Sequence, residues 1–174
     1  MKKGRRIKEH NPTFGILGLS AAESFWFPDI YQNGKKALEN RGIRVIEGKT
    51  LHSSYRYLAE KPENIAESLH DMFARSDVDA VMCAGGGICM NKVLPYINFD
   101  LLMENWKPFI GISNIIVLMT ALLQNGMASF HGPFIIWNYG VDGTPTNFTH
   151  GIVIKMLSGG MGNLTSISRW HSFR

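Results

Sequence analysis

The feature that most constrains the fold of this chain is the alternation of short apolar runs with segments of helical type. Four runs are apolar almost throughout, and each leads through a loop toward a helical segment; they cover residues 14–19, 43–46, 78–84 and 108–112. A fifth run is expected at residues 128–130. Strands without a polar face are typical of parallel sheets covered by helices on both sides. The sequence therefore predicts an α/β fold with an open, mostly parallel, Rossmann-like sheet and helices on both faces.

The predicted organisation divides the chain into three parts. Residues 1–12 form a basic tail, residues 13–140 form the α/β domain, and residues 141–174 form a linker or the start of a missing C-terminal domain. Within the last part, residues 151–157 suit a strand as well as a helix. At 174 residues the chain is long enough to bury a full core.

The net charge of +4 belongs to the N-terminus. Five of the 18 Lys and Arg residues lie within the first eight positions, and the others nearly balance the 14 Asp and Glu residues. We therefore expect a solvated tail and no nucleic-acid partner. No apolar run approaches the roughly 20 residues of a membrane span, and the N-terminus lacks the apolar core of a signal peptide. A cytoplasmic protein without a membrane partner is expected.

Two cysteines, Cys83 and Cys89, lie six residues apart with no histidine nearby. This spacing indicates neither a zinc site nor a disulfide framework, so reduced thiols are expected. The histidines and the carboxylates of the chain are scattered along the sequence. The sequence therefore predicts no metal and no cofactor.

Several loops follow the predicted strands and should meet at one edge of the sheet. The carboxyl ends of parallel strands lie on the same side, and ligands bind there in α/β sheets. The loops in question are residues 20–23, 85–87, 113–114 and 131–133. Chemistry is expected at this edge.

Ser113 is the strongest candidate for chemistry, because it lies between the apolar run 108–112 and the long apolar segment 115–124. A serine on a tight strand-to-helix turn faces unpaired N–H groups and the positive end of the helix dipole, which stabilise a developing oxyanion. Ser and Asn are also the preferred N-cap residues, and a cap needs no catalytic role. The local pattern leaves both interpretations open.

Two other features have alternative interpretations. The glycine loop 85–87 could cradle phosphate, but it lacks the G-x-G-x-x-G and Walker patterns. His131 follows a predicted strand and should point toward the same edge, either as a functional residue or as a structural turn residue. Five aromatic residues could line a pocket or belong to the core: Phe25, Trp26, Phe27, Trp137 and Tyr139.

Five blocks of the sequence resemble, in order, the N-terminal domain of the LD-carboxypeptidases and microcin-immunity proteins, a group of serine peptidases. These blocks are residues 15–17, 68–73, Gly86-Gly87 with 91–96, 109–114 and 130–133. The resemblance covers nearly the whole chain. The aromatic stretch that ends at Tyr139 and Gly140 favours the microcin-immunity branch.

The resemblance implies roles for five residues. Ser113 is the nucleophile, and the backbone N–H groups of Asn114 and Gly87 form the oxyanion hole. Gly86 and His131 belong to substrate binding. The implied substrate is a small peptide cleaved between an L-centre and a D-amino acid, or a peptide-nucleotide conjugate of the microcin type. No cofactor or metal is implied, and a Glu and a His from the family's second domain complete the triad.

The chain departs from the family pattern in ways that leave two hypotheses. The second domain with its Glu and His lies outside these 174 residues, and the family's Gly-Tyr-Ser-Asp motif reads Gly111-Ile112-Ser113-Asn114. One hypothesis is a serine hydrolase whose nucleophile domain is weak or inactive alone, because a serine needs a positioned base. The alternative is a non-catalytic, truncated homologue that acts as a binding or interaction module. In either case a homo-oligomer, such as a dimer, is expected.

Overall fold

The sheet of this protein is built from five parallel strands in the order β2-β1-β3-β4-β5. The computed structural model describes residues 6–8, 10–141 and 147–160. The strands are β1 (Thr13–Leu17), β2 (Arg44–Glu47), β3 (Ala80–Cys83), β4 (Phe109–Gly111) and β5 (Phe130–His131). All four pairings between neighbouring strands are parallel. The predicted α/β fold is confirmed.

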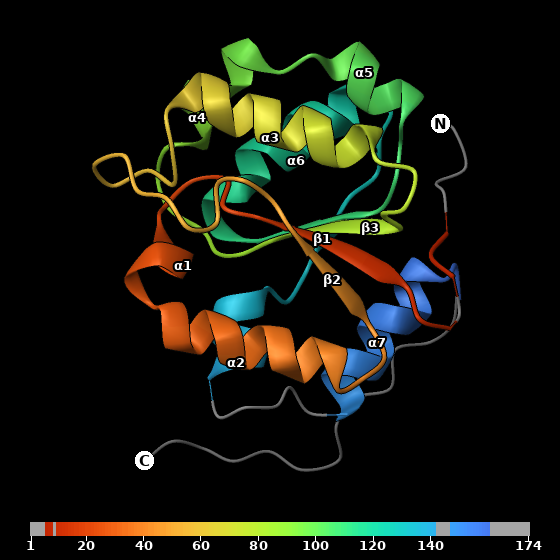
Figure 1. Cartoon of the computed structure of the whole chain (residues 1–174). Helices are drawn as coiled ribbons and strands as arrows, with labels where there is room; N and C mark the ends of the chain where they lie inside the picture. The colour runs from red at the N-terminus through yellow and green to blue at the C-terminus, as the bar shows by residue number, and fades with distance from the viewer. Residues whose placement is uncertain (1–5, 9, 142–146, 161–174) are drawn as a thin grey trace, which may run out of the picture.

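Helices cover both faces of the sheet (Figure 1). On one face lie α3 (Pro62–Ala74), α4 (Met90–Val93), α5 (Phe99–Glu104) and α6 (Ile116–Gln124). On the other lie α2 (Pro28–Glu39) and α7 (Asn147–Leu157). Shorter elements connect them: α1 (Glu23–Trp26), η1 (Leu94–Tyr96), η2 (Ser113–Ile115) and η3 (Ile135–Gly140).

Two prolines mark helix starts in this fold. Pro28 and Pro62 stand at the first positions of α2 and α3, where a proline loses no helical hydrogen bond. The apolar face of α3 is buried against the sheet, and Met72 fills the space that Gly15 of β1 leaves open. This two-sided burial explains why the strands carry no polar face.

Two expectations are corrected by the structure, and one open choice is settled. The fifth strand covers Phe130–His131 rather than residues 128–130. Residues 151–157 belong to helix α7, which settles the choice between strand and helix. The solvated tail is wrong for Ile7, which is 4% exposed and donates its N–H to the carbonyl of Leu157 at 3.1 Å.

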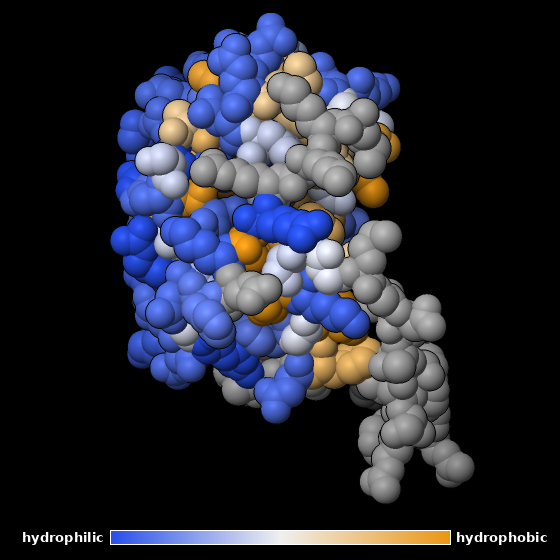
Figure 2. All heavy atoms as spheres, turned by 90° about the vertical axis from the view of Figure 1, so that its right-hand side faces the viewer, coloured by the Kyte–Doolittle hydropathy of each residue, from blue (hydrophilic) through white to orange (hydrophobic). Residues whose placement is uncertain are grey.

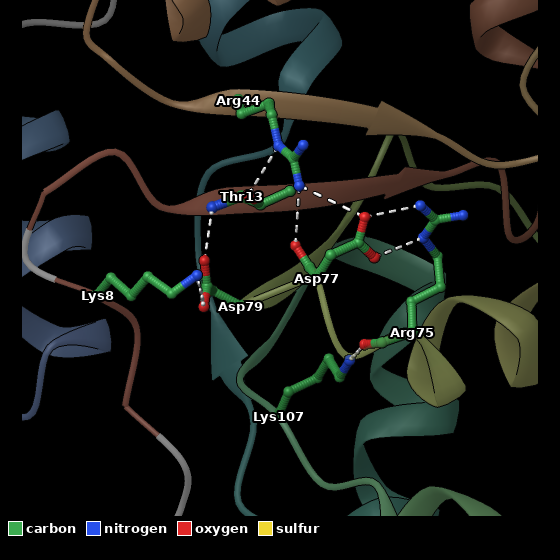
Figure 3. A network of polar contacts seen from close by, with 7 residues as sticks. All are labelled: Lys8, Thr13, Arg44, Arg75, Asp77, Asp79 and Lys107. Atoms are coloured by element: carbon green, nitrogen blue, oxygen red, sulfur yellow. Dashed lines mark hydrogen bonds and ion pairs between the residues drawn. The ribbon is translucent and has the colours of Figure 1, made fainter.

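A polar network ties the amino ends of the strands together (Figure 3). Asp79 accepts the N–H of Thr13 at 2.8 Å and pairs with Lys8 at 3.5 Å. Asp77 forms ion pairs with Arg44 at 3.4 Å and with Arg75 at 2.8 Å. Charged side chains thus hold the amino edge, at the far side of the sheet from the loops where chemistry was expected.

In the part of the chain that the structure describes, no helix has the length and apolar character that crossing a membrane requires. Figure 2 looks onto the side of the molecule that carries α7, where hydrophobic residues are exposed between polar ones. The cytoplasmic location stays a prediction.

Candidate active site

The candidate site lies at the point in the sheet where the connections between successive strands change direction. Strand β1 pairs with β2 on one side and β3 on the other, so the connections that leave β1 and β3 diverge to opposite sides. Sheets with this strand order bind ligands outside the carboxyl ends of the strands at that point. Three loops meet there: residues 18–22 after β1, 84–89 after β3 and Ile112 with Ser113 after β4.

Ser113 occupies a strained turn between β4 and helix α6. Its φ is +54°, in the left-handed region that non-glycine residues rarely adopt, and the preceding Ile112 is fully extended. The cap interpretation of Ser113 is not supported, because Ile112 holds the cap position of η2 and no side-chain cap hydrogen bond forms. Strain of this kind costs on the order of 1–3 kcal/mol and gathers at functional sites.

Two glycines allow other backbone to approach this turn. A Cβ on Gly111 would lie 2.5 Å from the Cγ2 of Ile115, so only glycine lets the helix start so close to the strand. A Cβ on Gly86 would lie 2.8 Å from the Cβ of Ser113 and 3.1 Å from its Oγ. Ser113 itself is exposed, whereas Gly86 is buried. The serine hydroxyl therefore lies directly against the glycine loop.

Gly87 must also be glycine. Its φ is +140°, and a Cβ there would lie 2.5 Å from the Oγ of Ser20 and 2.6 Å from the N of Ala21. Ala21 donates its N–H to the carbonyl of Gly86 at 2.9 Å. Within the described residues, the N–H of Gly87 forms no hydrogen bond. It is thus a donor that a ligand can use.

The side chain of Asn114 joins the three loops. Its Oδ1 accepts the N–H of Met90 at 2.7 Å and the hydroxyl of Ser20 at 3.1 Å. Ser20 is buried, and its Oγ accepts the N–H of Cys89 at 3.1 Å. Asn114 therefore uses its side chain to hold the neighbouring loops, and this leaves its backbone N–H in the first turn of the helix, where such groups have no intrahelical partner.

The arrangement suits nucleophilic attack with oxyanion stabilisation. An exposed hydroxyl lies beside a glycine loop with an unused N–H and at the start of a helix, where the dipole favours negative charge. Among the residues that the structure describes, no histidine or carboxylate forms a hydrogen bond with Ser113. The described part of the site therefore holds an exposed hydroxyl and backbone N–H donors, with no base in hydrogen-bond contact.

His131 lies in a different environment from Ser113. It is exposed at the end of β5 and lines a groove of about 360 Å³ between β5 and α7. The groove is otherwise mostly apolar, with Phe130, Pro133, Ile152 and Met156 among its lining residues. Its role in substrate binding stays a prediction.

The five aromatic residues divide between surface and core. Phe25, Trp26, Phe27 and Trp137 are between 40% and 51% exposed, and Tyr139 is fully buried. Phe27 and Trp137 pack edge to face with ring centroids 5.6 Å apart. Tyr139 thus belongs to the core, and a pocket lined by the four exposed rings stays a prediction.

Glu23 is the residue that the sequence interpretation missed. It begins α1, directly after the loop that follows β1, and its carboxylate is packed against the glycine loop. Burial raises the pKa of Glu23, although the adjacent Gly86 backbone and Trp137 side chain act the other way. The sequence contained one signal that could have found Glu23. It is a carboxylate among small residues, in the loop that follows the first predicted strand.

No group of three or more His, Cys, Asp or Glu side chains suited to a metal ion is found in the described ranges. Cys83 and Cys89 are free and buried, as expected for reduced thiols. Burial raises the pKa of Cys83 to about 12.

Residues 15–132 match the family described as the LD-carboxypeptidase N-terminal domain. The chain belongs to this family. The matched region begins in β1, contains the Ser113 turn and the glycine loop, and ends directly after β5. The family resemblance expected from the sequence is confirmed.

Relatives of this domain include proteins named as murein carboxypeptidases. A probable murein peptide carboxypeptidase of Bacillus subtilis is 39% identical over 106 residues, which are 60% of this chain and 33% of that protein. A murein tetrapeptide carboxypeptidase of Pseudomonas aeruginosa is 33% identical over 123 residues, or 70% of this chain and 40% of that protein.

A solved structure shows the same fold. The microcin C7 self-immunity protein MccF in complex with aspartyl sulfamoyl adenosine aligns with a TM-score of 0.84 and 22% identity, over 90% of this chain and 47% of that one. The chain therefore spans less than half the length of the proteins it matches.

Proposed function

We propose that this domain carries the nucleophile of an LD-carboxypeptidase-type serine hydrolase. Ser113 attacks a carbonyl carbon, and the N–H groups of Gly87 and Asn114 stabilise the oxyanion that forms. The observation that supports this most is the +54° φ of Ser113 directly against Gly86. A capping serine needs neither the strain nor the close glycine.

The general base is proposed to lie outside the described residues. A serine hydroxyl is a weak nucleophile until a positioned base accepts its proton. Family members complete this machinery with a Glu and a His of their second domain. We therefore expect the 174-residue chain alone to be slow or inactive.

The proposed substrate is a small peptide-like amide. The two relatives are named for murein peptides, and the similar solved structure holds aspartyl sulfamoyl adenosine. Both classes present an acyl group that a serine can attack. We carry them to this chain as two candidates, a peptidoglycan tetrapeptide and an aminoacyl-nucleotide conjugate, handled in the cytoplasm.

The test compares hydrolysis of both candidates by the wild-type chain and by Ser113→Ala. Release of the terminal D-amino acid, or of the free amino acid from aspartyl sulfamoyl adenosine, is followed by mass spectrometry. The proposal predicts slow release that disappears in Ser113→Ala. A full-length murein tetrapeptide carboxypeptidase serves as the positive control.

The alternative is a non-catalytic binding or interaction module. Binding of either candidate by calorimetry, with equal affinity in wild type and Ser113→Ala and with no hydrolysis, would favour that alternative. Light scattering on the same samples tests the predicted homo-oligomer.

A further inference from the structure

Glu23 is a half-buried acid at the site to which the proposed function gives no role. Its Oε2 atom is buried and, within the described residues, accepts no hydrogen bond. Leaving a carboxylate oxygen in this condition costs free energy, since buried polar groups are normally paired. A half-buried acid in such a place needs an explanation.

The glycine loop is shaped around this side chain. A Cβ on Gly85 would overlap the Oε2 of Glu23, so any other residue at position 85 would displace the carboxylate. The Gly86 backbone and the Trp137 side chain both act to lower the pKa of this carboxyl group, so both lie next to it. Glu23 thus connects the loop after β1, the loop after β3 and η3.

These contacts fix the peptide that carries the oxyanion donor. The backbone of Gly86 faces the Glu23 carboxyl group, and the carbonyl of Gly86 accepts the N–H of Ala21 at 2.9 Å. In a trans peptide the N–H of Gly87 points opposite to the carbonyl of Gly86. A bond from the Gly86 N–H to Glu23 would hold Gly86 at both of its polar groups and so set the direction of the Gly87 N–H.

Gly86 needs such support because it is flexible and adjacent to the nucleophile. Glycine has more accessible backbone conformations than any other residue, and three glycines in succession have no side chains to restrain them. An oxyanion donor is effective when it is held in place before the reaction. A small displacement at such a site costs a large factor in rate.

We propose that Glu23 is a positioning residue that binds the N–H of Gly86 and thereby holds the Gly87 N–H toward the carbonyl attacked by Ser113. This rests on the proposed function of Ser113. The other titratable group that interacts with Glu23 is Cys83 of β3, which stays a neutral thiol because burial, more than the Glu23 charge, raises its pKa. The loop itself and η2 contribute no charged group.

The test uses Glu23→Gln and Glu23→Ala, with Asp29→Asn as the matched control. Gln keeps an acceptor for the Gly86 N–H, Ala removes it, and Asp29 is an exposed acid in the first turn of α2. The first readout is the pH dependence and exchange rate of the Gly86 and Gly87 amides by ¹H–¹⁵N NMR. The second is the rate at which a fluorophosphonate labels Ser113.

In the wild type and Asp29→Asn, the Gly86 amide shift should titrate with a midpoint above the ordinary value of 4.5 for Glu. Glu23→Gln should abolish the titration while keeping the amide protected from exchange. Glu23→Ala should lose this protection and slow labelling about tenfold, whereas Gln restores most of the rate.

The proposal is overturned if the Gly86 amide does not follow Glu23, or if Ala and Gln are labelled equally fast. Should Glu23→Ala fail to fold, the titrations of the Gly86 amide in the wild type and in Glu23→Gln still decide whether this amide follows Glu23. A wild type that is not labelled at Ser113 contradicts the proposed function instead, and the amide data then judge the contact between Glu23 and Gly86 alone.

Discussion

Gly86 and Ser113 lie so close that a Cβ on the glycine would stand 2.8 Å from the Cβ of the serine. The two residues come from different loops, 27 positions apart in the chain. Their contact brings the glycine loop against the hydroxyl, and the first prediction follows from it.

Gly86→Ala should displace the Ser113 turn or the glycine loop. We expect a loss of about 1–3 kcal/mol in the free energy of unfolding, as for overpacking elsewhere, and slower labelling of Ser113 by a fluorophosphonate. Gly151→Ala is the matched control, since nothing lies within 4 Å of a Cβ at that position in α7. The free energy of unfolding of Gly151→Ala should rise by about 0.5–1 kcal/mol. Unchanged labelling in Gly86→Ala would show that the loop does not support the nucleophile.

Ser113→Gly should stabilise the protein while removing the hydroxyl. Glycine adopts a φ of +54° without strain, so a gain of about 1 kcal/mol over Ser113→Ala is expected in chemical denaturation. Arg56→Gly, at φ +61° in the loop before α3, relieves similar strain and should leave the labelling of Ser113 intact. If Ser113→Gly is no more stable than Ser113→Ala, the turn is not strained.

Asn114→Ala should loosen the loops that its side chain joins. The N–H of Met90 and the hydroxyl of Ser20 lose their shared acceptor, which should cost about 1–3 kcal/mol. Asn114→Asp keeps an acceptor oxygen, so its stability should lie closer to that of the wild type. Asn125→Ala removes an exposed hydrogen bond of 2.9 Å and should change stability by no more than about 0.5 kcal/mol. Equal effects of the two alanine variants would contradict a joining role for Asn114.

Glu23 should make the stability of the protein depend on pH. Because its pKa is raised in the folded state, the native protein holds a proton that the unfolded chain releases above pH 4.5. Stability should therefore fall as the pH rises from 4.5 through the folded pKa. Glu23→Gln should be more stable than the wild type above that range and lose this advantage near pH 4, as measured by urea midpoints across pH. A pH-independent difference would mean that the carboxyl is not buried.

Several parts of this structure follow from local sequence. The strands β1, β3 and β4 are apolar on both faces because helices cover both, and the prolines at positions 28 and 62 mark helix starts. Strand β5 is displaced from its predicted position because only two residues pair with β4, too few for a pattern to define.

The site depends on contacts that a local pattern does not contain. A serine between a strand and a helix suits a cap as well as a nucleophile, and what separates the two is the backbone angle and the approach of Gly86. The burial of Glu23 depends on Gly85, 62 residues later, and on Trp137. Family resemblance indicated Ser113 as the candidate nucleophile but carried no information about Glu23.

The most direct test of this account is fluorophosphonate labelling of the folded chain, read by peptide mass spectrometry. The account predicts an adduct on Ser113 that is absent from Ser113→Ala and from the unfolded wild type. It also predicts slow formation, because the base is proposed to lie outside the described residues. A folded wild-type sample without an adduct on Ser113, under conditions that label a full-length murein tetrapeptide carboxypeptidase, would contradict the nucleophile assignment.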